Sequence, residues 1–60
     1  MLNVKDFQEC MLDQDKVMFK NLRTNEVMYD GFFGHIPDRW WYKTVFNLHA
    51  KDDKMVIYTY

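Results

Sequence analysis

Residues 16–20 read Lys16-Val17-Met18-Phe19-Lys20, and at this stretch the hydrophobic periodicity of the chain changes. Val17 and Phe19 fall on one side of an extended chain and the lysines on the other, which is the pattern of a half-buried β-strand. Before Asp15 the spacing of apolar residues is helical instead. The change of period predicts a helix followed by a sheet, and therefore an α+β fold.

The N-terminal segment has the spacing of a short amphipathic helix. Val4, Phe7 and Met11 recur at i, i+3 and i+7, as residues on one face of a helix do. Asn3 is a candidate N-cap because its side chain can accept a hydrogen bond from a free backbone N–H. We predict a helix over residues 3–12.

The rest of the chain has the character of short strands joined by turns. Residues 51–54 are turn-forming, and Pro37 followed by Asp38 suits the start of a short helical turn near residues 37–42. Because the connections are short, the simplest topology is an N-terminal helix packed on a four-stranded antiparallel meander sheet. The expected strands are centred near Val17–Phe19, Val27–Tyr29, Val45–Leu48 and Met55–Tyr58.

Composition limits the class of protein. Sixty residues correspond to one small domain, 1–60. Eight Lys and Arg against nine Asp and Glu give a formal charge of −1, so the chain as a whole has no basic field that attracts nucleic acid or anionic lipid. One Cys excludes an internal disulfide framework. The sequence has neither an export signal nor a long apolar run, and we expect a cytoplasmic protein without a membrane partner.

Large side chains are unusually frequent for a chain of this length. Five Phe, four Tyr, two Trp and five Met are more than one small core is expected to bury. The last strand has apolar bulk on both sides, with Val56 and Tyr58 on one and Met55 and Ile57 on the other. A sheet that is apolar on both faces is covered twice, so we expect a homodimer or a higher assembly.

The adjacent tryptophans single out one candidate surface. Neighbours on a helix diverge by about 100°, so Trp40 and Trp41 are not expected to play the same role. Trp40 stands four residues after Ile36 and is assigned to the core, while Trp41 is assigned to the accessible side. Aromatic and Arg side chains are enriched at interface hot spots. The expected partner-binding residues are Phe33, Arg39, Trp41, Tyr42 and Lys43.

The main functional hypothesis is a small non-enzymatic protein-binding module that acts through this aromatic surface. An alternative is a nucleic-acid-binding module. It would use Lys16, Lys20 and Arg23, three cations with no acid between them, together with nearby Trp and Tyr rings. A further alternative is a structural subunit of a larger assembly, with Tyr60 in an added edge strand.

Residues for catalysis, metal binding or cofactor binding do not form a recognisable pattern. The chain has no Ser, and Cys10 is placed on the apolar side of a helix, where a thiol is usually inert. Cys10, His35 and His49 do not fall at the short spacings of zinc ligands. We therefore expect no enzyme activity, no metal and no cofactor.

The order of motifs resembles a known class of sequences. A Val-x-Phe strand at residues 17–19, Val-x-Tyr-Asp-Gly at 27–31, Ile-Pro-Asp at 36–38 and a final Val-Ile-Tyr at 56–58 are similar to short open reading frames of phages and mobile elements of Gram-positive bacteria. This resemblance covers nearly the whole chain and implies an accessory protein that acts on a host protein, for example as an inhibitor. Trp40-Trp41 departs from the pattern, in which aliphatic residues are usual.

Overall fold

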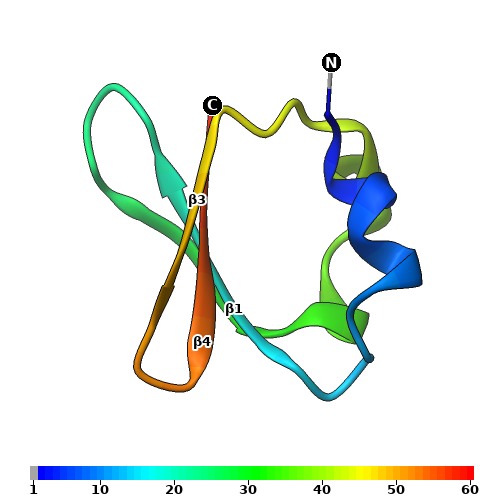
Figure 1. The fold of residues 1–60 in the computed structure, drawn as a ribbon. Coiled ribbons are helices and arrows are strands. Elements are labelled where there is room, and N and C mark those ends of the chain that lie inside the picture. Colours follow the sequence, from blue (N-terminus) through cyan, green and yellow to red (C-terminus); the bar gives the residue numbers. More distant parts are fainter. Residues whose placement is uncertain (1) are drawn as a thin grey trace.

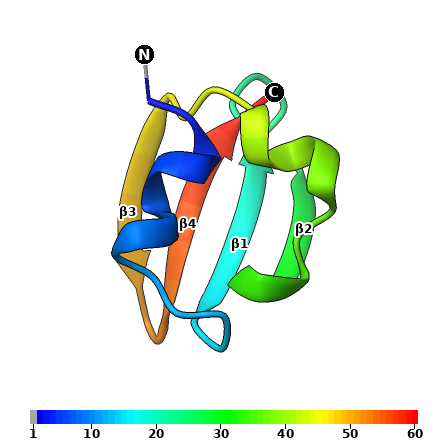
Figure 2. The ribbon, with the colours of Figure 1, turned by 90° about the vertical axis from the view of Figure 1, so that its right-hand side faces the viewer.

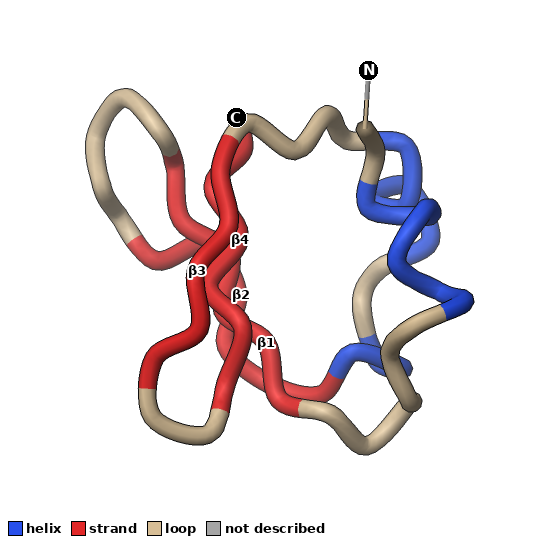
Figure 3. Tube along the Cα trace, in the orientation of Figure 1, coloured by secondary structure: helices blue, strands red, loops and turns tan. Residues whose placement is uncertain are grey.

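The computed structural model describes residues 2–60 as a four-stranded sheet with a layer of short 3₁₀ helices on one face (Figures 1 and 3). The strands are β1 (Lys16–Asn21), β2 (Val27–Phe32), β3 (Asn47–Lys51) and β4 (Lys54–Thr59). The helices are η1 (Val4–Glu9), η2 (Phe33–His35) and η3 (Asp38–Tyr42). None of the helices in residues 2–60 has the length and apolar character needed to cross a bilayer.

The strand order is β2-β1-β4-β3, and Figure 2 shows the strands side by side behind the helices. β1 and β2 form one antiparallel hairpin and β3 and β4 another, while β1 and β4 pair in parallel, with Val17 opposite Met55 and Phe19 opposite Ile57. The predicted α+β class and four strands are confirmed, but the predicted antiparallel meander is wrong. Residues 33–46 cross the sheet on its helical face, and they exceed the roughly twelve residues that such a crossover requires.

The N-terminal helix is shorter than the predicted residues 3–12. It begins after Asn3, whose backbone N–H donates a 2.8 Å hydrogen bond to the Asp6 carboxylate. Val4 is buried, as its place in the apolar spacing predicts. Because η1 ends at Glu9, Cys10 is exposed rather than packed on a helical face.

The third strand begins later than expected, at Asn47 rather than near Val45. The preceding residues pair with the N-terminus instead of continuing the sheet. Val4 N–H donates to the Lys43 carbonyl at 3.0 Å, and Val45 N–H donates to the Leu2 carbonyl at 2.8 Å. These bonds hold the start of η1 against the end of the crossover.

The core lies between the sheet and the helical layer. Phe19 is at its centre, with the ring of Trp40 stacked on it at a centroid distance of 5.3 Å and the ring of Tyr29 edge-on at 6.0 Å. Each ring comes from a different element, so this cluster fastens η3 to the first hairpin. The buried core residues are Val4, Val17, Phe19, Phe33, Ile36 and Ile57.

Gly34 in η2 is a position where a side chain does not fit. Its N–H donates a 2.9 Å hydrogen bond to the Asp13 carbonyl, and a Cβ added to it would lie 2.6 Å from the Cβ of Asp13. Gly34→Ala is therefore expected to lower the free energy of unfolding by roughly 1–3 kcal/mol, the usual cost of forcing atoms into a packed site. Urea denaturation followed by circular dichroism measures this loss.

Gly31→Ala is the matched control for this variant. Its added Cβ would lie 3.0 Å from the Tyr29 hydroxyl oxygen, a less severe overlap than the 2.6 Å approach at Gly34, so a smaller loss is expected. An unchanged midpoint for Gly34→Ala would contradict the close packing of η2 against the segment around Asp13.

Candidate functional site

The surface predicted around the tryptophans is only partly accessible. Phe33 is 1% exposed in the core, and its expected place on an accessible surface is wrong. Trp41 is half-buried and meets the ring of Phe33 edge-on at 5.1 Å. The physical reason is that η2 turns Phe33 under the helical layer, where Trp41 covers it.

The other residues of that predicted surface lie around η3. Tyr42 is 69% exposed, with the Lys5 ammonium 5.7 Å from its ring centre, and Arg39 is also exposed. Lys43 is half-buried, with its Nζ 5.4 Å from the Trp40 ring centre. Of the surface that the sequence predicts, only a small patch around Tyr42 and Arg39 is therefore fully exposed.

The sheet face opposite the helices is uncovered. Strand alternation sends Val17, Phe19 and Ile57 toward the helical layer, so their neighbours in sequence point to the open side. Because β1 and β4 pair in parallel at the centre of the sheet, the open-side residues of one strand lie next to those of the other. The residues that β1 and β4 contribute to this open face are Lys16, Met18, Lys20, Lys54, Val56 and Tyr58.

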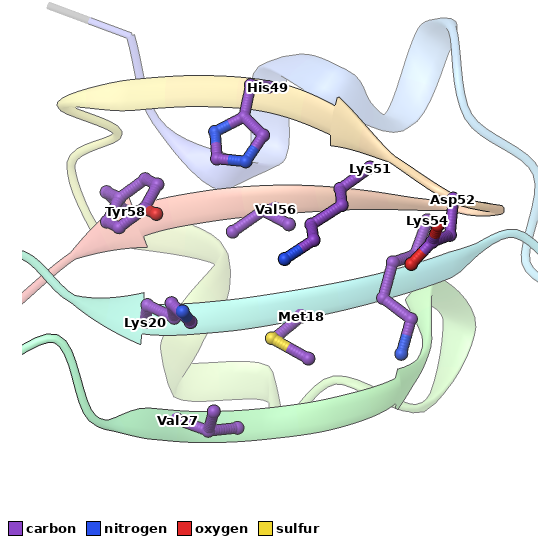
Figure 4. A pocket seen from close by; sticks show the side chains of 9 residues that line it. All are labelled: Met18, Lys20, Val27, His49, Lys51, Asp52, Lys54, Val56 and Tyr58. Carbon is purple, nitrogen blue, oxygen red and sulfur yellow. The ribbon is translucent and has the colours of Figure 1, made fainter.

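The open face contains a shallow hollow of about 450 Å³. Figure 4 shows Met18 and Val56 in its floor, between the lysine side chains and the rings of Tyr58 and His49. Val56 is 3% exposed although no helix covers it, because the stems of neighbouring long side chains shield it. The hollow is lined by Met18, Lys20, Val27, His49, Lys51, Asp52, Lys54, Val56 and Tyr58.

Both hairpin connections deepen this side of the sheet. Figure 1 shows the β1–β2 loop and the β3–β4 turn bending away from the helical layer. Asn25 and Asp52 sit in these turns with φ of 63° and 56°, a left-handed conformation that Asn and Asp tolerate better than other side chains. The open face is thus concave between the two turns.

Positive charge gathers on the open face. Lys54 Nζ lies 3.0 Å from Asp30 Oδ1, a surface ion pair worth about 0–1 kcal/mol. Within residues 2–60 no other ion pair is formed, so Lys16, Lys20 and Lys51 are free to meet an external anion. The acids near the N-terminus lie in η1 and in the loop that follows it, outside the sheet: Asp6, Glu9, Asp13 and Asp15.

Aromatic rings form a strip at one end of the same face. His49 and Tyr58 lie 5.8 Å apart with their planes 34° apart. Tyr60 follows Tyr58 on the same side of the chain, and the guanidinium of Arg23 lies 4.4 Å from the centre of its ring. Of the alternative nucleic-acid residues, Lys20 lines the hollow, Arg23 lies at the Tyr60 ring, and Lys16 is placed on this face only by strand alternation.

His49, Lys51, Lys54 and Tyr58 were not linked to the first strand by sequence reasoning. A meander would have placed the first and last strands at opposite edges of the sheet, with their side chains far apart. No local signal linked the two strands, because residues 55–58 are apolar on both sides of the strand and the parallel pairing joins distant stretches of the chain.

Potential metal ligands are dispersed. Cys10 is exposed beyond the end of η1, His35 contacts Phe32 at a ring distance of 5.8 Å, and His49 lies on the open face. Across residues 2–60 there is no group of three or more His, Cys, Asp or Glu side chains that could hold a metal ion.

Comparison of the chain with protein families, curated proteins and solved structures gives no match. The resemblance to phage and mobile-element reading frames thus stays a prediction, and the geometry of the open face carries the functional argument.

Proposed function

We propose that this protein is a small non-enzymatic binding module whose ligand surface is the open face of the sheet and whose ligand is polyanionic. The single observation that carries the proposal is the excess of lysines over carboxylates on this face. The open face carries Lys16, Lys20, Lys51 and Lys54 against Asp30, which is paired with Lys54, and Asp52 at the rim of the hollow. The acids of residues 6–15 lie in the helical layer and its loop. A net charge of −1 therefore coexists with a local positive field, which attracts an anionic partner.

A second copy of the chain is a poor occupant of this face. A two-fold homodimer brings the same patch of both subunits together, so one lysine-rich patch would face another. Like charges in contact oppose association. The homodimer expected from the apolar last strand would need another surface, such as one around the exposed Phe46.

The patch around η3 is the weaker candidate for binding a host protein. Phe33 is buried and Trp41 half-buried, which leaves Tyr42 and Arg39 as its exposed large side chains. Hot spots are fully desolvated clusters rather than single rings. The open face offers a larger concave area with several charges, and this favours it as the working surface.

The test is binding of fluorescein-labelled heparin, measured by fluorescence anisotropy at low salt. The double variant Lys20→Gln/Lys51→Gln is expected to bind about tenfold more weakly, since each exposed charge contact contributes about 0.2–1 kcal/mol. Lys5→Gln/Arg39→Gln is the matched control, because it removes the same net charge from the helical layer and is expected to change affinity less than about twofold.

Two outcomes would contradict the proposal. One is equal weakening by both double variants, which would mean that net charge rather than the open face governs binding. The other is absence of heparin binding by the wild-type protein. Circular dichroism of each variant checks that the fold is retained.

A further inference from the structure

We infer that the polyanion is a single-stranded nucleic acid, with its phosphates on the lysines of the open face and its bases on the apolar and aromatic floor. This inference rests on the proposed function and names the ligand of the same surface. It is carried by a feature that charge alone does not explain, namely the apolar and aromatic side chains that lie between the cations.

The floor of the hollow suits a planar ring. Met18 and Val56 are adjacent across the β1–β4 pairing and lie between Lys20 and Lys51 (Figure 4). Neighbouring side chains cover Val56, which is 3% exposed, so the half-buried Met18 and Tyr58 supply the accessible apolar surface of the floor. The hollow of about 450 Å³ falls in the range of about 300–1,000 Å³ that small-molecule groups occupy in proteins. A base placed there would leave its phosphates close to the ammonium groups at the rim.

The rings continue this floor along β4. Tyr58 and Tyr60 are two residues apart, so their side chains are spaced by roughly 6.5 Å along the strand. His49 lies beside Tyr58 at 5.8 Å, and Arg23 stacks on Tyr60. Aromatic rings and Arg planes in a positively charged groove are the elements with which proteins stack successive bases of a single strand.

Other polyanions match only part of this surface. An acidic peptide would satisfy the lysines, but its carboxylates do not alternate with flat rings that need an apolar floor. A nucleic-acid duplex exposes phosphates while its bases are stacked inside the helix, so Tyr58 and Met18 would lack a partner. A single strand presents phosphates and accessible base faces together, which complements both parts of the open face.

The experiment measures anisotropy of a labelled ten-nucleotide oligothymidylate, with Tyr58→Leu as the variant and Tyr42→Leu as the control. Tyr58→Leu keeps apolar bulk but removes the ring, and stacking on one ring changes affinity by about tenfold. Tyr42→Leu changes an exposed tyrosine in the helical layer and should bind as wild type. Loss of oligothymidylate binding together with unchanged heparin binding in Tyr58→Leu is the expected result.

Salt dependence gives a second readout. Three lysines free to contact phosphates predict that log affinity falls with log salt concentration with a slope of about −2. A slope near zero would overturn the inference, and so would a decaglutamate peptide that binds as tightly as the oligonucleotide or a duplex that binds more tightly. In each of those cases heparin binding through Lys20 and Lys51 would leave the proposed function standing, whereas loss of all polyanion binding would remove both.

Discussion

Phe19→Ala is expected to unfold the protein at room temperature. Phe19 is 0% exposed on the central strand β1, with Trp40 stacked on one side and Tyr29 edge-on. Truncation of a buried Phe to Ala costs about 3–5 kcal/mol. A 60-residue domain has a total stability of about 3–9 kcal/mol, so the loss removes most of it. Far-UV circular dichroism with urea titration measures the result.

Phe46→Ala is the matched control, since it makes the same chemical change at a site that is 43% exposed. Its ring meets Tyr60 at 4.8 Å but does not enter the core cluster. We expect a loss of about 1 kcal/mol or less, as for surface positions in general. Equal losses in the two variants would contradict the position of the core between the sheet and the helical layer.

Trp41→Ala is expected to destabilise the protein by about 2–4 kcal/mol, somewhat less than truncation of a fully buried Trp. The face assignment made from sequence predicts instead that this variant stays fully stable and loses only its partner. The structure changes that expectation because Trp41 is half-buried and packs edge-on against the buried Phe33. Thermal melting followed by circular dichroism distinguishes the two expectations.

Trp40→Ala should show a loss of similar size, because Trp40 packs on Phe19 and Tyr29. Tyr42, which follows Trp41 in η3, is 69% exposed. The Tyr42→Ala variant should therefore have a melting temperature within a few degrees of the wild-type value. The three variants therefore test one statement: both tryptophans cover the core, and Tyr42 does not. If Trp41→Ala melts at the wild-type temperature, Trp41 does not cover the core, and its assignment to the accessible surface would be correct.

Both tryptophans reach the core because their neighbours differ. The divergence of adjacent helical residues predicts that two side chains point in different directions, and it does not say that one of them points to solvent. η3 is part of the crossover that packs on the sheet. From it, Trp40 packs on Phe19 of the first hairpin, while Trp41 packs on Phe33 of η2. Whether a side chain of a short helix is buried depends on the elements packed around the helix as well as on the position of the residue within it.

The open face gives a physical account of the excess of large side chains. Val56 and Tyr58 point away from Ile57 and Thr59, as the alternation of the last strand predicts. The second apolar side is present, but lysines frame it, and it is therefore suited to an amphipathic anionic ligand rather than to a second hydrophobic core. This is why the proposed function follows the second sheet face and not the turn that contains the tryptophans.

Local spacing was sufficient to determine the elements. Two-residue alternation predicted the strand at Lys16–Lys20, and a continuous apolar run predicted the strand at Met55–Tyr58. The i, i+3 spacing from Val4 predicted the first helix, and Pro37-Asp38 predicted the start of the last helical turn. These features are decided within a few residues, by side-chain periodicity and backbone preference. The sequence by itself therefore determined the α+β class, the four strands and the inward and outward sides of β1, whereas β4, apolar on both sides, was oriented by its place in the sheet.

Only the tertiary structure decided which strands are neighbours. The parallel pairing of β1 with β4 joins residues about forty positions apart in the chain, and no local pattern encodes it. The free energy that selects it comes from burying Val17, Phe19 and Ile57 under the crossover of residues 33–46. The same pairing brings Lys20 beside Tyr58 and makes one surface from two separate stretches, so the candidate binding face is a product of topology.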